Sequence, residues 1–277
     1  MSQRDQDTIT EAVLASFAQT PDARLRTIMS SLVQHLHAFA KDVQLTEAEW
    51  FHAIDFLTRC GHITDDKRQE FILLSDVLGL SMLTVALNND KPEGCTESTV
   101  FGPFHVEGAP HYAAGEDLAN GAKGTPCLVR GQVRGVGGEA IAGAVMDVWQ
   151  SDAEGLYDVQ RADLTQAQAR GVVTTDNQGR FGFRSIVAVP YPIPHDGPVG
   201  EMLAATKRHP WRPAHLHFKI QAPGYETLIT HVFNRQSDYL SSDAVFGVRP
   251  SLVCDWVEQA DGSYLLEYDF VLNPLAA

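Results

Sequence analysis

An α+β fold, with an N-terminal helical region followed by an antiparallel β-sandwich, is predicted by a change of hydrophobic period along the 277-residue chain. In the first part of the chain, apolar residues recur at three- and four-residue spacing, as on one face of a helix. After residue 125, apolar and polar residues alternate in short runs that are separated by turn sequences. We therefore predict a helical region over residues 1–92 and a sandwich domain over residues 93–277.

Three sequences in the first region are typical of helix starts. Thr8 with Glu11 and Thr46 with Glu49 have the spacing of a capping box, and Thr20 precedes a proline. After Thr20, one apolar stripe is formed by Leu25, Ile28, Leu32, Leu36 and Phe39.

A further helix is predicted to begin at Thr64 and to end before the polar segment 88–94, which contains proline and glycine. Its apolar face would be formed by Phe71, Leu74, Leu78, Met82 and Val85.

Seven short runs after residue 125 have the composition of β-strands and are separated by turns such as Pro223-Gly224 and Asp261-Gly262. They cover residues 127–134, 141–150, 170–175, 180–187, 215–221, 227–233 and 264–271. This number of short strands predicts a sandwich. The segments 188–213 and 234–262 are long for hairpin loops, so we expect them to carry function or extra local structure.

The charge balance argues against nucleic acid or an anionic membrane as the partner. The chain has 21 basic and 35 acidic residues, which give a net charge of −14, and either partner would require a basic patch. The sequence contains no run of about 18 apolar residues, which a membrane span would require, and the first residues lack the apolar core of a signal peptide. The four cysteines are scattered and are expected to be reduced, so we predict a cytoplasmic protein.

His215-Leu216-His217 is a candidate metal site if the backbone is a strand, because residues i and i+2 then point to one face. A second copy, His35-Leu36-His37, lies in a helical pattern, where residues two apart do not face each other. The histidine pair alone favours a buried or surface pair that binds no metal over a metal site. Further ligands are needed, and Tyr157 and Tyr191, each of which by itself suggests a packing residue, stand in unusual turn and proline-rich settings.

Taken together, three motifs resemble the intradiol ring-cleaving dioxygenases. They are Gly155-Leu156-Tyr157-Asp158 after Val148-Trp149-Gln150, Pro190-Tyr191-Pro192-Ile193-Pro194, and Arg212-Pro213-Ala214-His215-Leu216-His217. The resemblance covers nearly the whole chain. It implies that Tyr157, Tyr191, His215 and His217 bind one non-haem Fe(III) per subunit. It also implies that Arg212 stabilises negative charge on the substrate ring, with a structural salt bridge as the alternative role.

The chemistry of these donors suits ferric iron. Phenolate is a hard anionic ligand that favours Fe(III), whereas ferrous oxygenases use two histidines and one carboxylate. By family analogy, an aromatic diol would lose two protons, one to Tyr191 and one to a hydroxide from solvent, and its two ring oxygens would be held by the metal. O2 then adds to the ring and opens it between the two hydroxyls.

Within the family, the segments 98–104, 191–202 and 208–214 resemble the hydroxyquinol-cleaving branch. The implied reaction opens benzene-1,2,4-triol to 3-hydroxy-cis,cis-muconate, which tautomerises to maleylacetate; the near alternatives are catechol and chlorocatechols. The implied substrate pocket contains Leu73, Asp76, Val100, Phe101, Gly102, Pro103, Phe104, Ile193, Pro194, Arg212 and Val245. Asp76 is expected to recognise the third hydroxyl, with a helix-surface or capping aspartate as the alternative. His231, where the catechol branch has glutamine, is expected near the metal without binding it.

The resemblance also implies a homodimer joined by the N-terminal helices, with phospholipid in an apolar channel between them. The alternative is that the apolar stripes pack on the chain's own sandwich. An alternative of another functional class is a transthyretin-like binding module whose histidines are structural. Iron content and colour distinguish the two classes, because a colourless protein without iron would favour the binding module.

Overall fold

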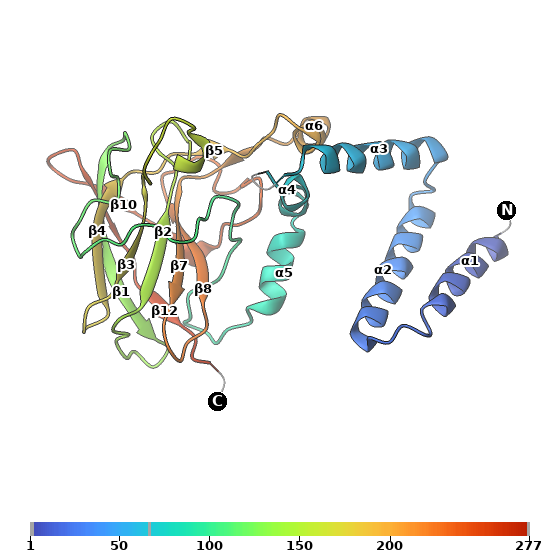
Figure 1. Ribbon diagram of the computed structural model, residues 1–277, viewed down its shortest axis with the longest axis horizontal. Helices are drawn as coiled ribbons and strands as arrows, with labels where there is room; N and C mark the ends of the chain where they lie inside the picture. Colours follow the sequence, from blue (N-terminus) through green and yellow to red (C-terminus); the bar gives the residue numbers. More distant parts are fainter. Residues whose placement is uncertain (1–2, 66–67, 276–277) are drawn as a thin grey trace. The chain divides into compact units, whose positions relative to one another are not determined.

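A computed structural model describes residues 3–65 and 68–275 and divides the chain into two compact units, Met1–Arg59 and Cys60–Ala277. The first unit contains α1 (Gln3–Ser16), α2 (Ala23–Asp42) and most of α3 (Glu47–Ile63), as Figure 1 shows. All the other helices and all the strands lie in the second unit. The predicted boundary between residues 92 and 93 stays a prediction: the last helix before the first strand ends at Asn88, and the division of the chain into two units falls after Arg59.

The start of α3 is confirmed as a capping box: the Thr46 backbone N–H donates to Glu49 Oε2 (2.9 Å), and the Glu49 N–H donates to Thr46 Oγ1 (3.3 Å). The other two predicted starts are wrong. Thr8 lies inside α1, and α2 is capped by Asp22, whose carboxylate accepts from the N–H groups of residues 24 and 25, rather than by Thr20. A carboxylate directly before the first turn reaches these free N–H groups, whereas a hydroxyl two residues earlier does not.

The prediction of one helix from Thr64 is also wrong. Thr64 follows the end of α3, and two shorter helices, α4 (Glu70–Val77) and α5 (Leu80–Asn88), are bent by 78° relative to each other. The bend occurs at Gly79, whose φ of +75° is left-handed and ends α4. Among the described residues, no single helix is long and apolar enough to cross a membrane, although α4 and α5 taken together pass that test by length and composition.

In the second unit, two five-stranded sheets pack face to face (Figure 1). In one, β1 (Pro126–Gly135) pairs with β4 (Arg180–Ile186), β11 (Tyr264–Glu267) and β12 (Phe270–Leu272), and β10 (Trp256–Glu258) pairs with β11. The other has the order β3 (Arg170–Thr174), β2 (Val145–Trp149), β7 (His215–Gln221), β8 (Leu228–Asn234), β9 (Val253–Cys254).

The predicted helical region followed by a sandwich is confirmed, but the sheets are mixed rather than purely antiparallel. β1 pairs in parallel with β11 and with β12, and β8 pairs in parallel with β9. The long connection after β8 allows this, since parallel strands need a crossover rather than a hairpin.

The predicted run 264–271 is divided into β11 and β12 by an irregularity opposite β1. The Asp269 carboxylate accepts from the Gln132 N–H (2.9 Å) in place of a backbone carbonyl. Gly131 is required there, because a Cβ at this position would lie 1.8 Å from the Tyr268 carbonyl oxygen.

The core lies between the two sheets, and β7 contributes Leu216, Phe218 and Ile220 to it. The alternate residues of the same strand, His215 and His217, therefore point to the opposite face. Extra structure occurs in both long segments, as expected: α6 (Pro198–Ala205), β5 (Tyr191–Pro192) and β6 (Trp211–Arg212) in the first, and a 3₁₀ turn at Pro250–Leu252 in the second.

Candidate metal centre

His215 and His217 are almost completely buried, at 1% and 0% exposure, and their Nε2 atoms lie 3.1 Å apart. His215 Nδ1 lies 2.7 Å from the Pro213 carbonyl oxygen, which can only accept a hydrogen bond. Nδ1 therefore carries the proton, and Nε2 presents a lone pair to the site. The ring of His217 stacks on Trp149 at 4.7 Å between centroids, which fixes the plane of the second imidazole.

Tyr157 reaches the same point from the turn after β2. The turn requires Gly155, which has a φ of +78° and lies so close to Tyr191 that a Cβ would approach its side chain to 3.1 Å. The backbone N–H of Tyr157 donates to Gln160 Oε1 (2.9 Å), and the next residue, Asp158, forms a buried ion pair with Arg170. Tyr157 Oη lies 2.8 Å from His217 Nε2.

Tyr191 comes from β5, which pairs with β6 so that Tyr191 is opposite Arg212. Its hydroxyl accepts a hydrogen bond from Tyr157 Oη at 3.1 Å. Two phenol oxygens and two imidazole nitrogens thus converge from β7, β5 and the turn after β2. Atoms bound to one metal at about 2.0–2.2 Å lie about 3 Å from each other, so the donor set fits a single ion.

The protonation states also fit a metal site. Burial, reinforced by the charge of Arg212 and, for His217, by the neighbouring His215, holds the pKa of both histidines well below the ordinary value, which leaves neutral imidazoles. Burial and then the nearby Tyr191 raise the pKa of Tyr157 well above its usual range. A phenolate in this position therefore needs a bound cation to stabilise its charge.

His231 on β8 is opposite His217 in the strand register, as expected for a residue near the centre. One ligand atom from each of His215, His217 and His231 falls within 4.8 Å of the others. His231 Nδ1 lies 3.4 Å from Arg212 Nη2, so one of its two ring nitrogens already has a neighbour other than a metal.

Arg212 is 2% exposed, and it makes polar contacts both with the candidate metal ligands and with a carboxylate. Its Nη1 lies 3.4 Å from Tyr191 Oη and 3.3 Å from His215 Nε2. It also forms a buried salt bridge with Asp243, with Nε 3.1 Å from Oδ1. Asp243 was not predicted, because a single aspartate in a long loop has no distinguishing sequence pattern.

A cavity of about 580 Å³ leads to Tyr191 and Arg212. Its lining includes ten of the eleven residues predicted for the pocket: Leu73, Asp76, Val100, Gly102, Pro103, Phe104, Ile193, Pro194, Arg212 and Val245. Phe101 is not part of the lining; its ring packs on His105 and on Trp149. Its predicted place in the pocket therefore finds no support in the structure.

Asp76 is 7% exposed although it lies on a helix, and it is not an N-cap. Burial raises the pKa of Asp76, and a hydrogen bond from Ser81 partly opposes this effect. A buried carboxylate in the cavity wall fits the predicted recognition of a hydroxyl.

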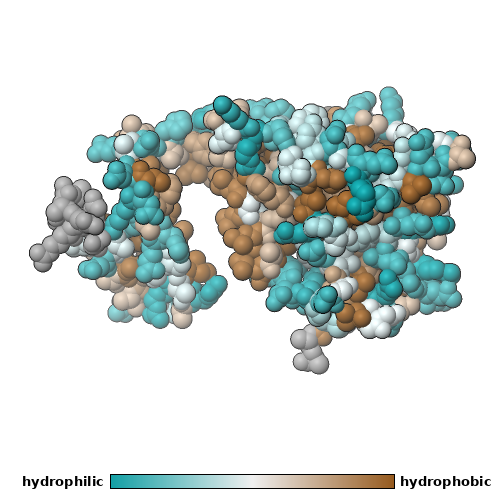
Figure 2. Space-filling model, turned by 180° about the vertical axis from the view of Figure 1, so that it is seen from behind, coloured by the Kyte–Doolittle hydropathy of each residue, from teal (hydrophilic) through white to brown (hydrophobic). Residues whose placement is uncertain are grey.

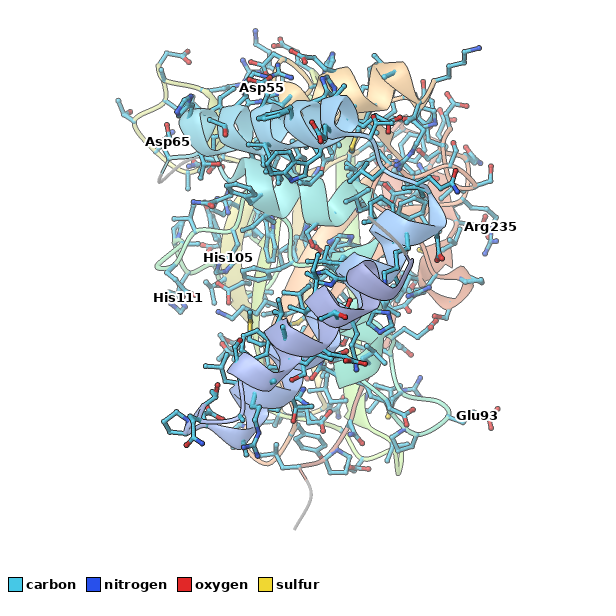
Figure 3. The ribbon with its side chains drawn as sticks, turned by 90° about the vertical axis from the view of Figure 1, so that its right-hand side faces the viewer. Asp55, Asp65, Glu93, His105, His111 and Arg235 are labelled. Carbon is cyan, nitrogen blue, oxygen red and sulfur yellow. The ribbon has the colours of Figure 1, made fainter. Side chains whose placement is uncertain are left out.

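Eight residues of the lining were not predicted, and the polar ones among them are Arg68, Gln69, Glu70, His105 and Gln160. His105 and His111 lie in the irregular segment before β1, where Figure 3 shows both. His105 directly follows the segment 98–104, so extending that motif by one residue would have found it. Arg68, Glu70 and Gln160 have no sequence signal that distinguishes them from surface residues.

The second histidine pair, His35 and His37, does not form part of a metal-compatible cluster among the described residues. His35 and His37 lie in α2, as predicted, and His37 Nδ1 is 2.9 Å from Thr10 Oγ1. Among the described residues, the metal-compatible cluster of histidine, cysteine and acidic groups is the one around β7.

Comparisons with known proteins agree with this geometry. The family described as "Dioxygenase" matches residues 100–274, and the one described as "Catechol dioxygenase N terminus" matches residues 22–96. The chain is 68% identical to a 6-chlorohydroxyquinol 1,2-dioxygenase of Cupriavidus pinatubonensis over 274 residues, which cover 99% of each chain. It is 51% identical to a hydroxyquinol 1,2-dioxygenase of Rhodococcus opacus, over 96% of this chain and 93% of that protein. A crystal structure of hydroxyquinol 1,2-dioxygenase from Pseudomonas putida superposes with a TM-score of 0.93, at 46% identity, and covers 99% of this chain and 100% of that one.

Proposed function

We propose, from the premise that this chain belongs to the intradiol dioxygenase family, that it cleaves hydroxyquinol with O2 between the adjacent hydroxyls. The product would be 3-hydroxy-cis,cis-muconate, in which both atoms of O2 are retained and which tautomerises to maleylacetate. The observation that carries the proposal is the convergence of two phenol oxygens and two imidazole nitrogens at the end of a cavity.

One ferric ion per subunit is proposed as the cofactor, with Tyr157, Tyr191, His215 and His217 as its ligands. Two anionic oxygens and two neutral nitrogens suit Fe(III), and the polar neighbours of the buried donor atoms are one another and the Arg212 guanidinium. When bound, ferric iron would supply a Lewis acid for the two ring oxygens and an acceptor of electron density that makes the ring reactive toward O2.

Tyr191 has the position required of a proton acceptor. It lines the cavity together with Arg212, whereas the lining does not include Tyr157, His215 or His217. A phenol oxygen that faces the cavity is within reach of a substrate hydroxyl. We therefore assign to Tyr191 the acceptance of one substrate proton.

Arg212 would stabilise negative charge on the bound ring. Its charge is retained at every relevant pH, because the nearby carboxylate of Asp243 and the tyrosines raise its pKa against the effect of burial. The charge lies in a buried, low-dielectric wall, where such an interaction is stronger than in water. Apolar residues complete the wall, and the Phe104 ring stacks on Tyr157 at 4.4 Å and shields that phenol from water.

Asp76 is proposed to accept a hydrogen bond from the third hydroxyl of hydroxyquinol. A buried hydroxyl without a partner costs about 1–3 kcal/mol, so a site for the triol needs an acceptor that a site for catechol does not. The buried carboxylate in the cavity wall supplies one.

A chlorinated hydroxyquinol is a second candidate substrate, favoured by the 68% identity to a protein named for that activity. Oxygen uptake with hydroxyquinol, 6-chlorohydroxyquinol, catechol and 4-chlorocatechol, measured side by side, tests the proposal. We expect a higher kcat/KM for the two triols than for the two catechols. A preference for catechol would contradict the substrate, and a colourless protein that takes up no iron would favour a non-catalytic binding module.

We also propose a homodimer joined by the helices, with phospholipid in the apolar channel between them. The α2 stripe is exposed, from 46% at Ile28 to 54% at Leu36 and Phe39, and α2 contains no buried residue. On α5, Leu80, Leu83 and Leu87 are 56–74% exposed, and Figure 2 shows apolar surface on both units. Apolar surface of this kind favours association with a second copy or with lipid over a monomer in water.

A further inference from the structure

The guanidinium of Arg212 has a buried neighbour for each of its five N–H groups. Nε and Nη2 approach the two carboxylate oxygens of Asp243 at 3.1 and 3.3 Å. Nη2 also lies near His231, and Nη1 lies near Tyr191 and His215, as described above. Asp243 therefore occupies one edge of the guanidinium and leaves Nη1 directed at two of the proposed metal ligands.

The carboxylate of Asp243 is itself fixed by the backbone. It accepts hydrogen bonds from the N–H of Val245 (3.3 Å) and of Gly247 (2.9 Å), and its side chain is 2% exposed. Gly247 allows this arrangement, since a Cβ there would lie 3.0 Å from Arg212 Nη2 and 3.2 Å from Asp243 Oδ2. The same turn places Val245 in the cavity wall.

The loop around Asp243 contains two non-glycine residues in the left-handed region. Tyr239 has a φ of 69° and Phe246 a φ of 59°. Such conformations persist only where the surrounding structure holds them, and they cluster at functional sites. Here the Tyr239 ring stacks on Trp211 at 5.6 Å, and the Arg208 guanidinium lies 5.0 Å from the centre of the Phe246 ring. The loop is thus tied on both sides of Asp243 to the segment that contains Arg212.

We propose that Asp243 is the positioning residue of this site: it orients the Arg212 guanidinium toward Tyr191 and His215 and balances its charge. The inference rests on the proposed function, because the effect on catalysis passes through Arg212. Asp243 does not line the cavity. Its effect is therefore distinct from that of a group that touches substrate.

Two consequences follow from the loss of the carboxylate. The guanidinium can rotate, so Nη1 no longer has a fixed direction. Its charge is also no longer balanced, and an unbalanced cation beside Tyr191 stabilises the phenolate more strongly. Stronger stabilisation moves the tyrosinate-to-iron absorption band to shorter wavelength.

The test compares Asp243→Asn and Asp243→Ala with a control, Asp269→Asn. The control removes an ion pair with Arg134, which lies on β1 in the sheet that does not contain the candidate metal ligands. Iron per chain, the visible band and kcat/KM per bound iron are measured for each. We expect the Asp243 variants to keep most of their iron, to lose about 10- to 100-fold in kcat/KM and to absorb at shorter wavelength. The control should match the wild type in all three.

A double-mutant cycle separates positioning from a general structural role. If Asp243 acts through Arg212, then Asp243→Ala should add little to the loss caused by Arg212→Ala. Equal band and activity per iron in wild type and Asp243→Asn would overturn the inference, as would additive losses. Asp243→Asn preserves the side-chain volume and carries the test if Asp243→Ala does not fold. A wild-type protein without iron or oxygen uptake would instead refute the proposed function.

Discussion

The tripeptide His-Leu-His occurs twice in this chain, and the two copies lie in opposite surroundings. In α2, Leu36 is 54% exposed and His35 is also exposed. In β7, Leu216 is completely buried in the core, and the two histidines beside it converge on the opposite face. The backbone alone separates the copies, because a strand places residues i and i+2 on one side and a helix does not. A ligand motif therefore has a meaning only together with the secondary structure that carries it.

The largest expected effect is on metal binding. His215→Ala and His217→Ala should each reduce bound iron to about a tenth or less of one ion per chain, because each removes a donor from a buried set. His35→Ala and His37→Ala should keep full iron, although the second loses its contact with Thr10. Iron analysis and visible absorption measure both. Full iron in His215→Ala, or unchanged colour in Phe variants of both tyrosines, would refute the ligand assignment.

The central leucines of the two tripeptides, Leu216 and Leu36, should differ in their contribution to the free energy of unfolding. Leu216→Ala leaves a cavity between two sheets and should lower the free energy of unfolding by about 2–5 kcal/mol. Leu36→Ala, at an exposed position, should change it by about 0.5 kcal/mol or less. Denaturant unfolding of the metal-free protein at low concentration gives both values. Similar losses at the two positions would mean that the α2 stripe is covered in solution.

Acidic side chains on helices offer a third contrast. Asp76→Ala should cut kcat/KM for hydroxyquinol about tenfold more than for catechol, since the lost bond involves a charged acceptor. Asp55 on α3, labelled in Figure 3, has a side chain that is 66% exposed and is paired with Arg59. Asp55→Ala should leave both substrates unaffected. Equal losses on both substrates in Asp76→Ala would remove this residue from the recognition of the third hydroxyl.

The buried histidines also predict a pH dependence for the metal-free protein. Burial holds the pKa of His215, His217 and His231 well below 6.5 in the folded state, with the Arg212 charge added for all three and the neighbouring histidines for His217 and His231. Below pH 6.5 the unfolded chain binds protons that the folded chain excludes, so the free energy of unfolding falls as the pH falls. The slope approaches about 1.4 kcal/mol per pH unit for each histidine. Unfolding between pH 7 and 5 should show a smaller slope in His231→Gln, and an equal slope would argue against this origin.

The smallest effect on catalysis is expected from the α2 stripe. Leu32→Glu places a charge on an apolar face that is 47% exposed at this residue and should convert the proposed dimer to a monomer. Light scattering measures the mass, and kcat per iron should stay within about twofold of the wild type. A wild-type monomer at micromolar concentration would contradict the dimer directly.

Local patterns predicted much of this molecule because local rules decide them. The period of two around residue 216 predicted both a strand and a shared face for two histidines, and the capping box at Thr46 predicted a helix start. Gly79 was not recognised as a break, since one glycine in an apolar run does not reveal that its φ is positive. The parallel pairing of β1 with β11 depends on contacts between residues more than a hundred positions apart, and no local period encodes it.

In the candidate site, too, local motifs predicted some residues, whereas a residue placed by long-range contacts was missed. Two tyrosines and two histidines were predicted from motifs, and the structure brings their donor atoms together. Asp243 was missed because its partner, Arg212, lies 31 residues earlier in the chain and only the folded loop joins the two.

The stacking of Trp149 on His217 makes this indole an optical probe of the site. Of the four tryptophans, it is the one whose ring lies 4.7 Å from a proposed ligand ring and nearly parallel to it, at 16°. A coloured ferric centre accepts excitation energy from a nearby indole, so loading the protein with iron should quench the emission of Trp149 strongly. Fluorescence titration can then follow occupancy of the site in real time, without substrate and without catalysis.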